Sequence, residues 1–277
     1  MKKNVAVLIT CHNRLKKTKK CLESIYLQKN IEKINIKIFL VDDGSNDGTS
    51  EYVKENFPKI KLIQGDGNLY WGGGMYLAWE EALKYEQNFD YFLWVNDDVI
   101  FFEDGISTLL NTVINKDNIV VGSFCDPVSK KTTYGGVVSK KKILNAFGLK
   151  LVEVNGFPQE VDGINGNGVL IPYLAFNQIG KFDKQFYHAG GDLDYALRAR
   201  KKNIKIYLTH KHVGYCERIQ SYKNVKSFKD IFEKKSLPPK IWFHFCRKHG
   251  GNLWILHFFF RFIKLCFKII INIIIKK

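Results

Sequence analysis

Apolar runs and helical spacings alternate along the first hundred residues. Short apolar runs predict buried strands at Val5–Thr10, Ile36–Val41, Ile60–Ile63 and Tyr91–Val95. Between these runs, apolar residues recur at helical spacing, which predicts helices over Leu15–Tyr26, Thr49–Asn56 and Met75–Tyr85. This alternation of strands and helices is typical of an α/β fold built on a parallel sheet.

The second half of the chain continues with a weaker pattern. We expect helices over Asp104–Ile114 and from Asp192 onward, and strands near Ile119–Gly122, Val169–Ile171 and Ile204–Leu208. Residues 123–160 indicate mixed strand and loop, with a hairpin at Thr132–Val138. The glycines of Gly163–Pro172 let a backbone approach a ligand closely, so we expect this segment to face the substrate; a glycine-rich turn is the alternative.

Polar and glycine-rich residues follow the predicted strands of the first half. These strand ends are Thr10-Cys11-His12-Asn13-Arg14, Val41-Asp42-Asp43-Gly44-Ser45, the run Gly65–Gly74, and Asn96-Asp97-Asp98. In open α/β sheets, ligands bind at the carboxyl ends of the strands. Burying the two carboxylates of Asp97 and Asp98 costs on the order of several kcal/mol unless something compensates. A divalent cation is one candidate, and a solvated Asx turn is the other.

These strand ends resemble the nucleotide-sugar half of family-two glycosyltransferases with a GT-A fold. The segment Gly67–Met75 resembles one found in a rhamnosyltransferase-like bacterial branch that builds surface polysaccharides, and the resemblance covers roughly residues 4–216. It implies a GT-A type, Rossmann-like nucleotide-sugar-binding sheet flanked by helices. The expected division is a glycosyltransferase domain over residues 1–222 (nucleotide-sugar half 1–99, acceptor half 100–222) and a helical tail over residues 223–277.

The resemblance also implies an activity. The chain would be an inverting, hexosyltransferase-type enzyme that moves a sugar from a UDP- or dTDP-linked donor to a glycan or polyprenyl-linked glycan acceptor. Thr10, His12 and Asp43 would hold the base and ribose, and Arg14 would reach the diphosphate. The donor-sugar pocket would be formed by Asn68, Trp71, Gly72, Gly73 and Gly74. Asp97 and Asp98 would bring in Mn²⁺ or Mg²⁺, with Asp98 as the direct ligand.

The helix that begins near Asp192 carries the expected catalytic residues. Inverting transfer needs a carboxylate that takes the proton of the acceptor hydroxyl. The family places this base at the start of this helix, and the motif matches at Asp192, although an aspartate there also complements the helix dipole. Asp194 would bind the acceptor or brace Asp192. Relatives often carry a further histidine ligand after the next strand; here His210, His212 and Cys216 remain alternatives.

Charge and cysteine usage set broader limits. The net charge of +16 would suit nucleic acid, an anionic membrane or phosphorylated substrates. A non-catalytic nucleotide- or nucleic-acid-binding protein is therefore the alternative, but outside the tail no basic stripe with interleaved aromatics is present, and we expect no nucleic-acid partner. A nucleotidyltransferase would carry glycines in Thr10–Arg14, which has none. Six cysteines without a CxxC pair, and a start without a signal-peptide pattern, favour a cytoplasmic protein.

The tail ends in a long apolar segment, Leu253–Ile275. Its polar residues recur every three or four positions and share one narrow helical stripe: His257, Arg261, Lys264, Lys268 and Asn272. A spanning helix would carry three cations near its centre, each costing about 2.5–3.5 kcal/mol, and a soluble core helix would need a groove around it. We expect an in-plane helix on the inner face of the plasma membrane, with its cations meeting lipid phosphates.

Overall fold

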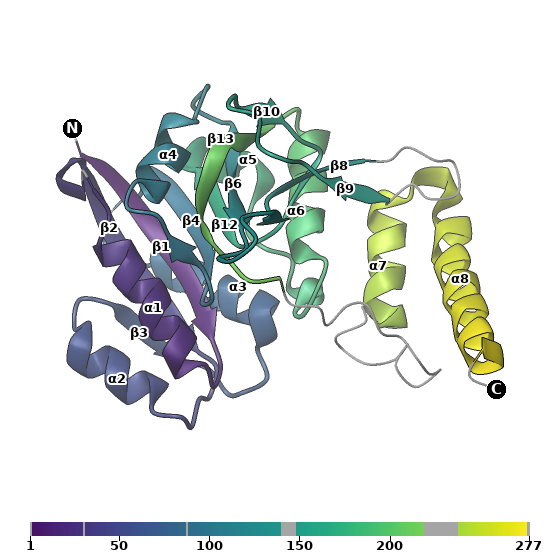
Figure 1. Cartoon of the computed structure of the whole chain (residues 1–277), viewed down its shortest axis with the longest axis horizontal. Coiled ribbons are helices and arrows are strands. Elements are labelled where there is room, and N and C mark those ends of the chain that lie inside the picture. Colours follow the sequence, from purple (N-terminus) through teal and green to yellow (C-terminus); the bar gives the residue numbers. More distant parts are fainter. Residues whose placement is uncertain (1, 30, 87, 140–147, 219–237, 276–277) are drawn as a thin grey trace.

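A mixed sheet of ten strands runs through the middle of the part of the chain that the computed structural model describes, residues 2–29, 31–86, 88–139, 148–218 and 238–275 (Figure 1). Its first half contains β1 (Lys3–Cys11), β2 (Ile34–Asp42), β3 (Lys61–Gln64) and β4 (Tyr91–Asn96). These strands are parallel and lie in the order β3-β2-β1-β4. The predicted α/β architecture of the first half is therefore confirmed.

The second half extends the same sheet beyond β4 with mixed direction. β12 (Gly168–Pro172) lies antiparallel between β4 and β6 (Ile119–Cys125), and β13 (Ile206–Tyr215) then pairs with β6 in parallel. The short strands β5 (Ile100–Phe101), β7 (Thr132–Tyr134) and β10 (Gln159–Glu160) pair at the margins. A separate three-stranded sheet contains β11 (Gly163–Ile164), β8 (Gly136–Ser139) and β9 (Leu149–Leu151).

The predicted hairpin at Thr132–Val138 is wrong. β7 pairs with β6 in the main sheet, whereas β8 pairs with β9 and β11 in the small one. The chain passes from one sheet to the other at Gly135, where φ is 155°. The backbone amide and carbonyl of Gly135 bond to Asn165, so the partner of this turn lies thirty residues away in sequence.

Helices cover both faces of the main sheet. On one face, buried side chains of α1 (Leu15–Tyr26), α2 (Thr49–Asn56) and α4 (Gly105–Asn111) pack on the strands. The other face carries α3 (Tyr70–Leu83), α5 (Tyr173–Ile179) and α6 (Gly191–Lys201). Short 3₁₀ turns occupy Ile31–Lys33, Lys184–Phe186 and Gly251–Leu253. Helices on both faces explain why the parallel strands are apolar throughout rather than alternating.

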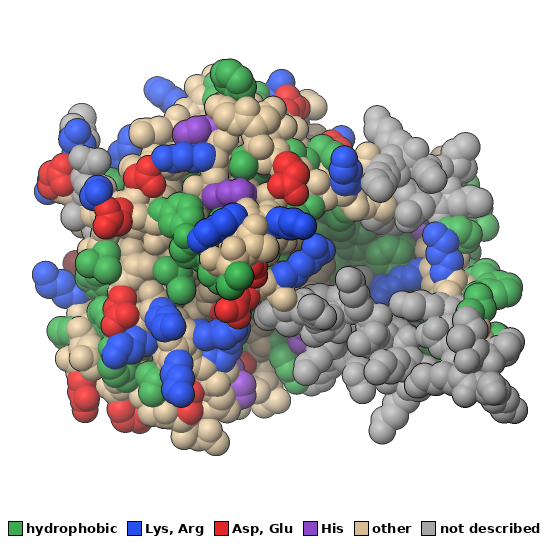
Figure 2. Space-filling view, in the orientation of Figure 1, with side chains coloured by type: hydrophobic (Ala, Val, Ile, Leu, Met, Phe, Trp, Pro, Cys, Tyr) green, Lys and Arg blue, Asp and Glu red, His purple; other side chains and the backbone are tan. Residues whose placement is uncertain are grey.

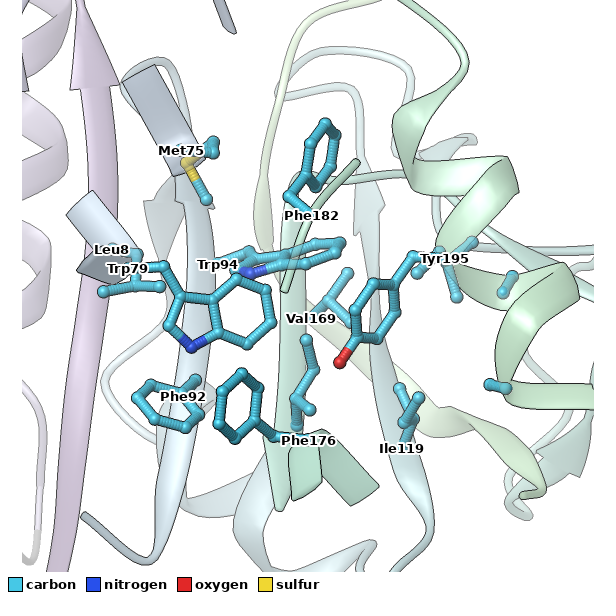
Figure 3. Packing of buried hydrophobic residues seen from close by; sticks show 14 of the residues in the cluster. Leu8, Met75, Trp79, Phe92, Trp94, Ile119, Val169, Phe176, Phe182 and Tyr195 are labelled. Atoms are coloured by element: carbon cyan, nitrogen blue, oxygen red, sulfur yellow. The ribbon is translucent and has the colours of Figure 1, made fainter. Parts of the chain in front are cut away.

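An aromatic cluster fills the face under α3 and α6 (Figure 3). Trp79 of α3, Trp94 of β4 and Tyr195 of α6 are fully buried, and their ring centroids lie 4.8–5.8 Å apart. Phe92 and Phe176 extend the cluster toward α5. Large edge-to-face rings of this kind contribute more than their buried area alone. The cluster fixes α6, which begins beside the predicted base, against the strand that ends in Asn96.

The C-terminal region forms two helices, α7 (Pro239–His249) and α8 (Trp254–Ile275), which lie side by side, with α7 between α6 and α8 (Figure 1). Pro239 is the first residue of α7 rather than a helix breaker, in a position where its missing N–H is not needed. Ile241, Phe245 and Cys246 are buried within the same core as α6. α7 therefore packs on the same core as α6, and the expected division at residue 222 stays a prediction; residues 219–237 lie outside the described part.

The helix α8 has two apolar sides. Trp254, Phe258 and Phe262 pack toward α7 and the core. Large apolar side chains on the opposite side are exposed, namely Ile255, Leu256, Phe259, Ile263, Phe267, Ile270 and Ile271. The guanidinium of Arg261 lies 5.0 Å above the ring of Trp242, so this cation is turned toward α7. The sequence pattern predicts instead that it faces lipid phosphates. Among the described residues, no helix meets the length and apolarity that crossing a membrane requires.

Candidate active site

The carboxyl ends of β1, β2 and β4 meet at one edge of the sheet. Thr10 is level with Val41 on one side and with Asn96 on the other, so the residues that follow these strands are neighbours. This is the arrangement that the sequence predicts for its polar strand ends. Thr10 itself is almost buried beneath Gly74 of α3, where a Cβ atom would lie only 2.1 Å from its hydroxyl oxygen.

Asp43 holds the loop that leads into α3. The residue is buried, and its two carboxylate oxygens accept hydrogen bonds from the backbone N–H groups of Gly67 (2.8 Å) and Tyr70 (2.9 Å). The exposed ring of His12 lies nearby, with Nδ1 2.5 Å from the carbonyl oxygen of Asp43. Asn68, in the loop between Gly67 and Tyr70, is exposed. These predicted nucleotide-binding residues therefore line one side of the edge.

Arg14 joins the two carboxylates that follow β4. Its Nη1 donates to Oδ1 of Asp97 at 2.7 Å, and its Nη2 donates to Oδ2 of Asp98 at 2.6 Å. The aspartate side chains are only 4% and 8% exposed, whereas that of Arg14 is 33% exposed. Burial raises the pKa of Asp97 to about 7, although Arg14 opposes this shift. The alternative of a fully solvated Asx turn is therefore wrong for this pair.

The donor set at this position fits a divalent cation of the oxygen-preferring kind. Mg²⁺-type ions are commonly held by one or two carboxylates, with substrate phosphates and water completing the shell. Asp97 and Asp98 supply two carboxylates, and the guanidinium between them already stands in for a cation. No group of three His, Cys, Asp or Glu side chains suited to a metal occurs among the described residues. Substrate phosphates and water are the usual further ligands of such an ion.

Cys216, not a histidine, lies beside the aspartates. Its Sγ is 3.6 Å from Oδ1 of Asp98 and 3.2 Å from the side-chain nitrogen of Asn167. Burial, followed by the charge of Asp98, raises the pKa of this thiol, which keeps it protonated. His212 lies inside β13, where its Nε2 is 3.0 Å from the hydroxyl of Thr132. β13 continues past Leu208, the predicted strand end, to Tyr215, which is why His210 and His212 are strand residues.

The sequence predicts a helix that begins at Met75, after the glycine run. In the structure the glycine run lies inside α3, which begins at Tyr70. Gly72 donates its N–H to the carbonyl of Tyr187 at 2.7 Å, and a Cβ atom there would meet the Phe186 carbonyl oxygen at 2.1 Å. Only glycine permits this approach. The indole N–H of Trp71 donates to Oδ1 of Asn96 at 2.7 Å. The start of α3 is thus fixed between β4 and the segment before α6.

Gly166 connects Trp71 to the predicted base. A Cβ atom on Gly166 would lie 2.4 Å from the ring of Trp71, and the backbone N–H of Gly166 favours the charged form of the Asp192 carboxylate. Asp192 is half-buried and also accepts from the N–H of Leu193 at 2.8 Å. Burial raises its pKa above the ordinary value, against these backbone hydrogen bonds. The candidate base therefore lies next to the predicted donor-sugar pocket.

Asp194 has a different environment. It is fully buried, and its oxygens pair with Arg198 of the same helix and with Lys248 and His249 of α7, each at 2.8 Å. Burial opposes ionisation, but the hydrogen bond from His249 and the two cations outweigh it and lower the pKa of Asp194. Asp194 thus links α6 to α7 through both of its carboxylate oxygens, and its expected role at the acceptor or beside Asp192 stays a prediction.

Sequence reasoning missed four contributors to the site. Asn96 holds Trp71, Asn167 holds Cys216, and Lys17 lies 3.9 Å from Asp98. Gly166 was included only within a glycine-rich segment. Asn96 ends β4 directly before Asp97, and Asn167 directly precedes β12, so their positions at strand ends were the available signal. Lys17 follows Arg14 by three residues, slightly less than one helical turn, which brings it to the same side of α1.

Sequence comparisons identify a family and several similar proteins. The family described as Glycosyl transferase family 2 matches residues 6–164, which is more than half of the chain. An uncharacterised glycosyltransferase of Rickettsia typhi is 27% identical over 188 residues, which cover 65% of this chain and 54% of that protein. One from Rickettsia conorii is 27% identical over 189 residues, 65% of this chain and 28% of that protein. The chain thus spans about half the length of the first relative, or less for the second.

Comparisons of structure show the same fold at low identity. TarS of S. aureus, residues 1–349, solved with UDP-GlcNAc, has a TM-score of 0.59 and 13% identity, covering 90% of this chain and 66% of that one. A mannosyltransferase from Pyrobaculum calidifontis, solved with GDP-Man and Mn²⁺, has a TM-score of 0.56 and 13% identity, covering 91% and 65%. GalNAc-T7, solved with UDP, GalNAc and Mn²⁺, has a TM-score of 0.61 and 14% identity, covering 80% and 44%.

Proposed function

The chain belongs to glycosyl transferase family 2, and from this premise we propose that it catalyses inverting, metal-dependent transfer of a sugar from a nucleoside-diphosphate sugar to a glycan or lipid-linked acceptor. The observation that carries the proposal is the position of Gly166, whose backbone lies against the ring of Trp71 and whose N–H favours the charged form of Asp192. Direct displacement at the anomeric carbon requires a general base close to the donor sugar. Here a single residue, Gly166, lies between the proposed sugar pocket at Trp71 and the proposed base.

Each residue has a proposed role in this reaction. Thr10, His12 and Asp43 bind the base and ribose, while Arg14 binds the diphosphate. Asn68, Trp71 and the first turn of α3 hold the donor sugar. Asp192 accepts the proton of the acceptor hydroxyl as that oxygen attacks. The raised pKa of Asp192 supports its role, since a base nearer neutrality takes a hydroxyl proton more readily.

Asp97 and Asp98 are proposed to hold the metal ion, with Asp98 as the direct ligand. When bound, a divalent cation stabilises the negative charge that develops on the departing nucleoside diphosphate. The Mn²⁺ in two neighbours with this fold supports a divalent ion, and the UDP-GlcNAc and GDP-Man complexes support a nucleotide-sugar donor. The proposed donor is UDP- or dTDP-linked.

A donor screen tests this function. UDP-, dTDP- and GDP-sugars are incubated with the full chain and Mn²⁺, and both hydrolysis of the donor and the shift in Tm are measured. We expect one nucleotide class to raise the Tm and to be hydrolysed slowly in the absence of acceptor. An Asp98→Asn variant serves as the control, and it should lose both effects. Absence of any nucleotide response in the wild type would contradict the proposal.

The exposed side of α8 supports a proposal for where the enzyme acts and on which acceptor. Its outer side exposes apolar residues such as Leu256, Phe259 and Phe267, which are 59%, 56% and 63% exposed (right-hand edge of Figure 2). Lys264 is also exposed and lies above the ring of Phe260. An amphipathic helix with an apolar side and cations binds in the surface of an anionic membrane. We therefore propose a cytoplasmic enzyme on the inner membrane face, acting on a polyprenyl-linked glycan.

A further inference from the structure

All four carboxylate oxygens of Asp97 and Asp98 have partners from the protein itself. Arg14 takes one oxygen of each residue, at 2.7 and 2.6 Å. The second oxygen of Asp97 lies 3.5 Å from the hydroxyl of Thr18, and that of Asp98 lies 3.6 Å from Sγ of Cys216. A cation that bound these carboxylates at the short metal–oxygen distance of about 2.1 Å would meet the guanidinium.

We propose that Arg14 is an exchangeable counter-ion that occupies the cation position until the donor arrives. This inference rests on the proposed function. In the protein without donor, the guanidinium compensates the two buried charges, and it must leave them before a divalent ion binds. The diphosphate of the donor then supplies a new partner for the guanidinium, since Arg pairs with phosphate through the same planar fork.

The surrounding contacts allow the side chain to move while the backbone stays in place. Asn13, which precedes Arg14, is held at φ 50° by a hydrogen bond to Ser45 and one from Asn46, each of 2.8 Å. The Arg14 side chain is 33% exposed, so one side of it already faces solvent. Lys17, 3.9 Å from Asp98, is too far for a hydrogen bond and cannot replace the fork. The exchange therefore involves a single side chain.

The consequence is a coupling between metal and donor. A group that competes with the metal in the free protein, and binds the donor when the metal is present, lowers metal affinity before the donor binds. By linkage, metal and donor then raise each other's affinity by the same factor. Arg14 is thus a positioning residue that makes metal binding depend on the donor.

The test measures Mn²⁺ binding by the full chain from the EPR signal of free Mn²⁺, first without nucleotide and then with saturating UDP or dTDP. Without nucleotide, Arg14→Ala should bind Mn²⁺ at least tenfold more tightly than the wild type. With nucleotide, that difference should shrink to within threefold. Arg14→Lys keeps the charge but cannot bridge both carboxylates, so it should bind at least threefold more tightly than the wild type; this variant carries the test if Arg14→Ala does not fold.

The matched control is Lys20→Ala, which removes a cation from the hollow beside Asp98, Tyr215 and Cys216 without removing an ion pair to a described residue. Figure 2 shows the surrounding lysines of α1 at the surface. Without nucleotide, the Mn²⁺ affinity of Lys20→Ala should stay within twofold of that of the wild type. The inference is overturned if Arg14→Ala binds Mn²⁺ no more tightly than the wild type, or if Lys20→Ala matches it. Nucleotide binding by the wild type is measured separately, so a failed exchange leaves the proposed function standing.

Discussion

Nε2 of His249 lies 2.8 Å from Oδ1 of Asp194, and this contact connects α7 to the helix that begins beside the candidate base. Lys248 reaches the same oxygen at 2.8 Å and also reaches Asp183 at 2.6 Å, in the segment before α6. Next to Asp183, Phe186 and Tyr187 contact Gly72 at the start of α3. α7 therefore supports both sides of the site, although it contributes no group to the chemistry.

Replacing Asp194 should chiefly reduce stability. Breaking a buried ion pair by removing one partner costs about 3–5 kcal/mol, because the other charges stay buried without compensation. We expect Asp194→Ala to lower the free energy of unfolding in urea by about that amount. Glu55→Ala, which removes an exposed carboxylate of α2, is the control and should change it by less than about 0.5 kcal/mol. Equal losses in the two variants would contradict the role of Asp194 as a link.

The Asp183 contacts should make the docking of α7 sensitive to acid. Burial opposes ionisation, yet Lys248, the N–H of Gln185 and His244 outweigh it and lower the pKa of Asp183 to about 2. A carboxyl with a lowered pKa adds stability above its ordinary pKa and loses it as the pH falls through the lowered value. The stability advantage of the wild type over Asp183→Asn should thus be constant above about pH 4 and shrink from there toward pH 2. Unfolding in urea at each pH measures it; a constant advantage throughout would refute the assignment.

Asp192→Asn should remove the transfer reaction and leave donor binding nearly unchanged. The amide cannot accept the acceptor proton, and a loss of about 10²–10⁴-fold in kcat is typical for a missing general base. Because burial raises the pKa of Asp192, the acid limb of the kcat/KM profile should lie above the ordinary aspartate value. Steady-state transfer assays and the nucleotide-induced Tm shift separate the two effects. A variant that kept most of its turnover would exclude Asp192 as the base.

The sheet edge where β1, β2 and β4 end could largely be predicted, because its residues follow from local sequence patterns. Buried strands are apolar on both faces, and the polar residues that end them stand out in the sequence. α2 begins and ends where the pattern predicts, at Thr49 and Asn56. The pairing of Thr10 with Asn96 then follows from the parallel order of the strands. The alternation of strands and helices along the sequence is therefore enough to predict that these strand ends share one edge of the sheet.

The features that escaped prediction depend on distant contacts. Three glycines disfavour a helix by their own propensity, yet α3 includes Gly72–Gly74. The carbonyl oxygen of Phe186 and the hydroxyl of Thr10 occupy the space that side chains at Gly72 and Gly74 would need. β13 continues through polar residues up to Tyr215 because β5 and β6 pair with it there. α7 lies in the predicted helical tail, and its Lys248 and His249 pair with the buried Asp194. None of these partners is near in sequence.

The glycines of α3 offer a test that compares two adjacent positions. A Cβ atom at Gly72 would overlap a backbone carbonyl that cannot move easily, whereas one at Gly73 would lie 3.3 Å from the side chain of Leu69. Gly72→Ala should therefore lose more than about 1–3 kcal/mol, the usual range for overpacking, together with donor binding. In the free energy of unfolding, Gly73→Ala should be close to neutral, because alanine favours the helix. Urea unfolding measures both variants, and similar losses of stability in the two would disprove this geometry.

The exposed side of α8 should bind an anionic membrane. Phe259 is 56% exposed on the outer side of the helix, and Phe157, 73% exposed on a distant loop, provides a matched control. Wild-type protein should co-sediment with vesicles that contain phosphatidylglycerol, and less so at high salt, because both apolar burial and cations contribute. Phe259→Glu should lose at least tenfold in vesicle affinity, because it puts a charge among the acyl chains, while Phe157→Glu should bind as the wild type does. If Phe259→Glu instead abolished a concentration-dependent dimer and left vesicle binding intact, the outer side would be an interface with a second copy of this chain.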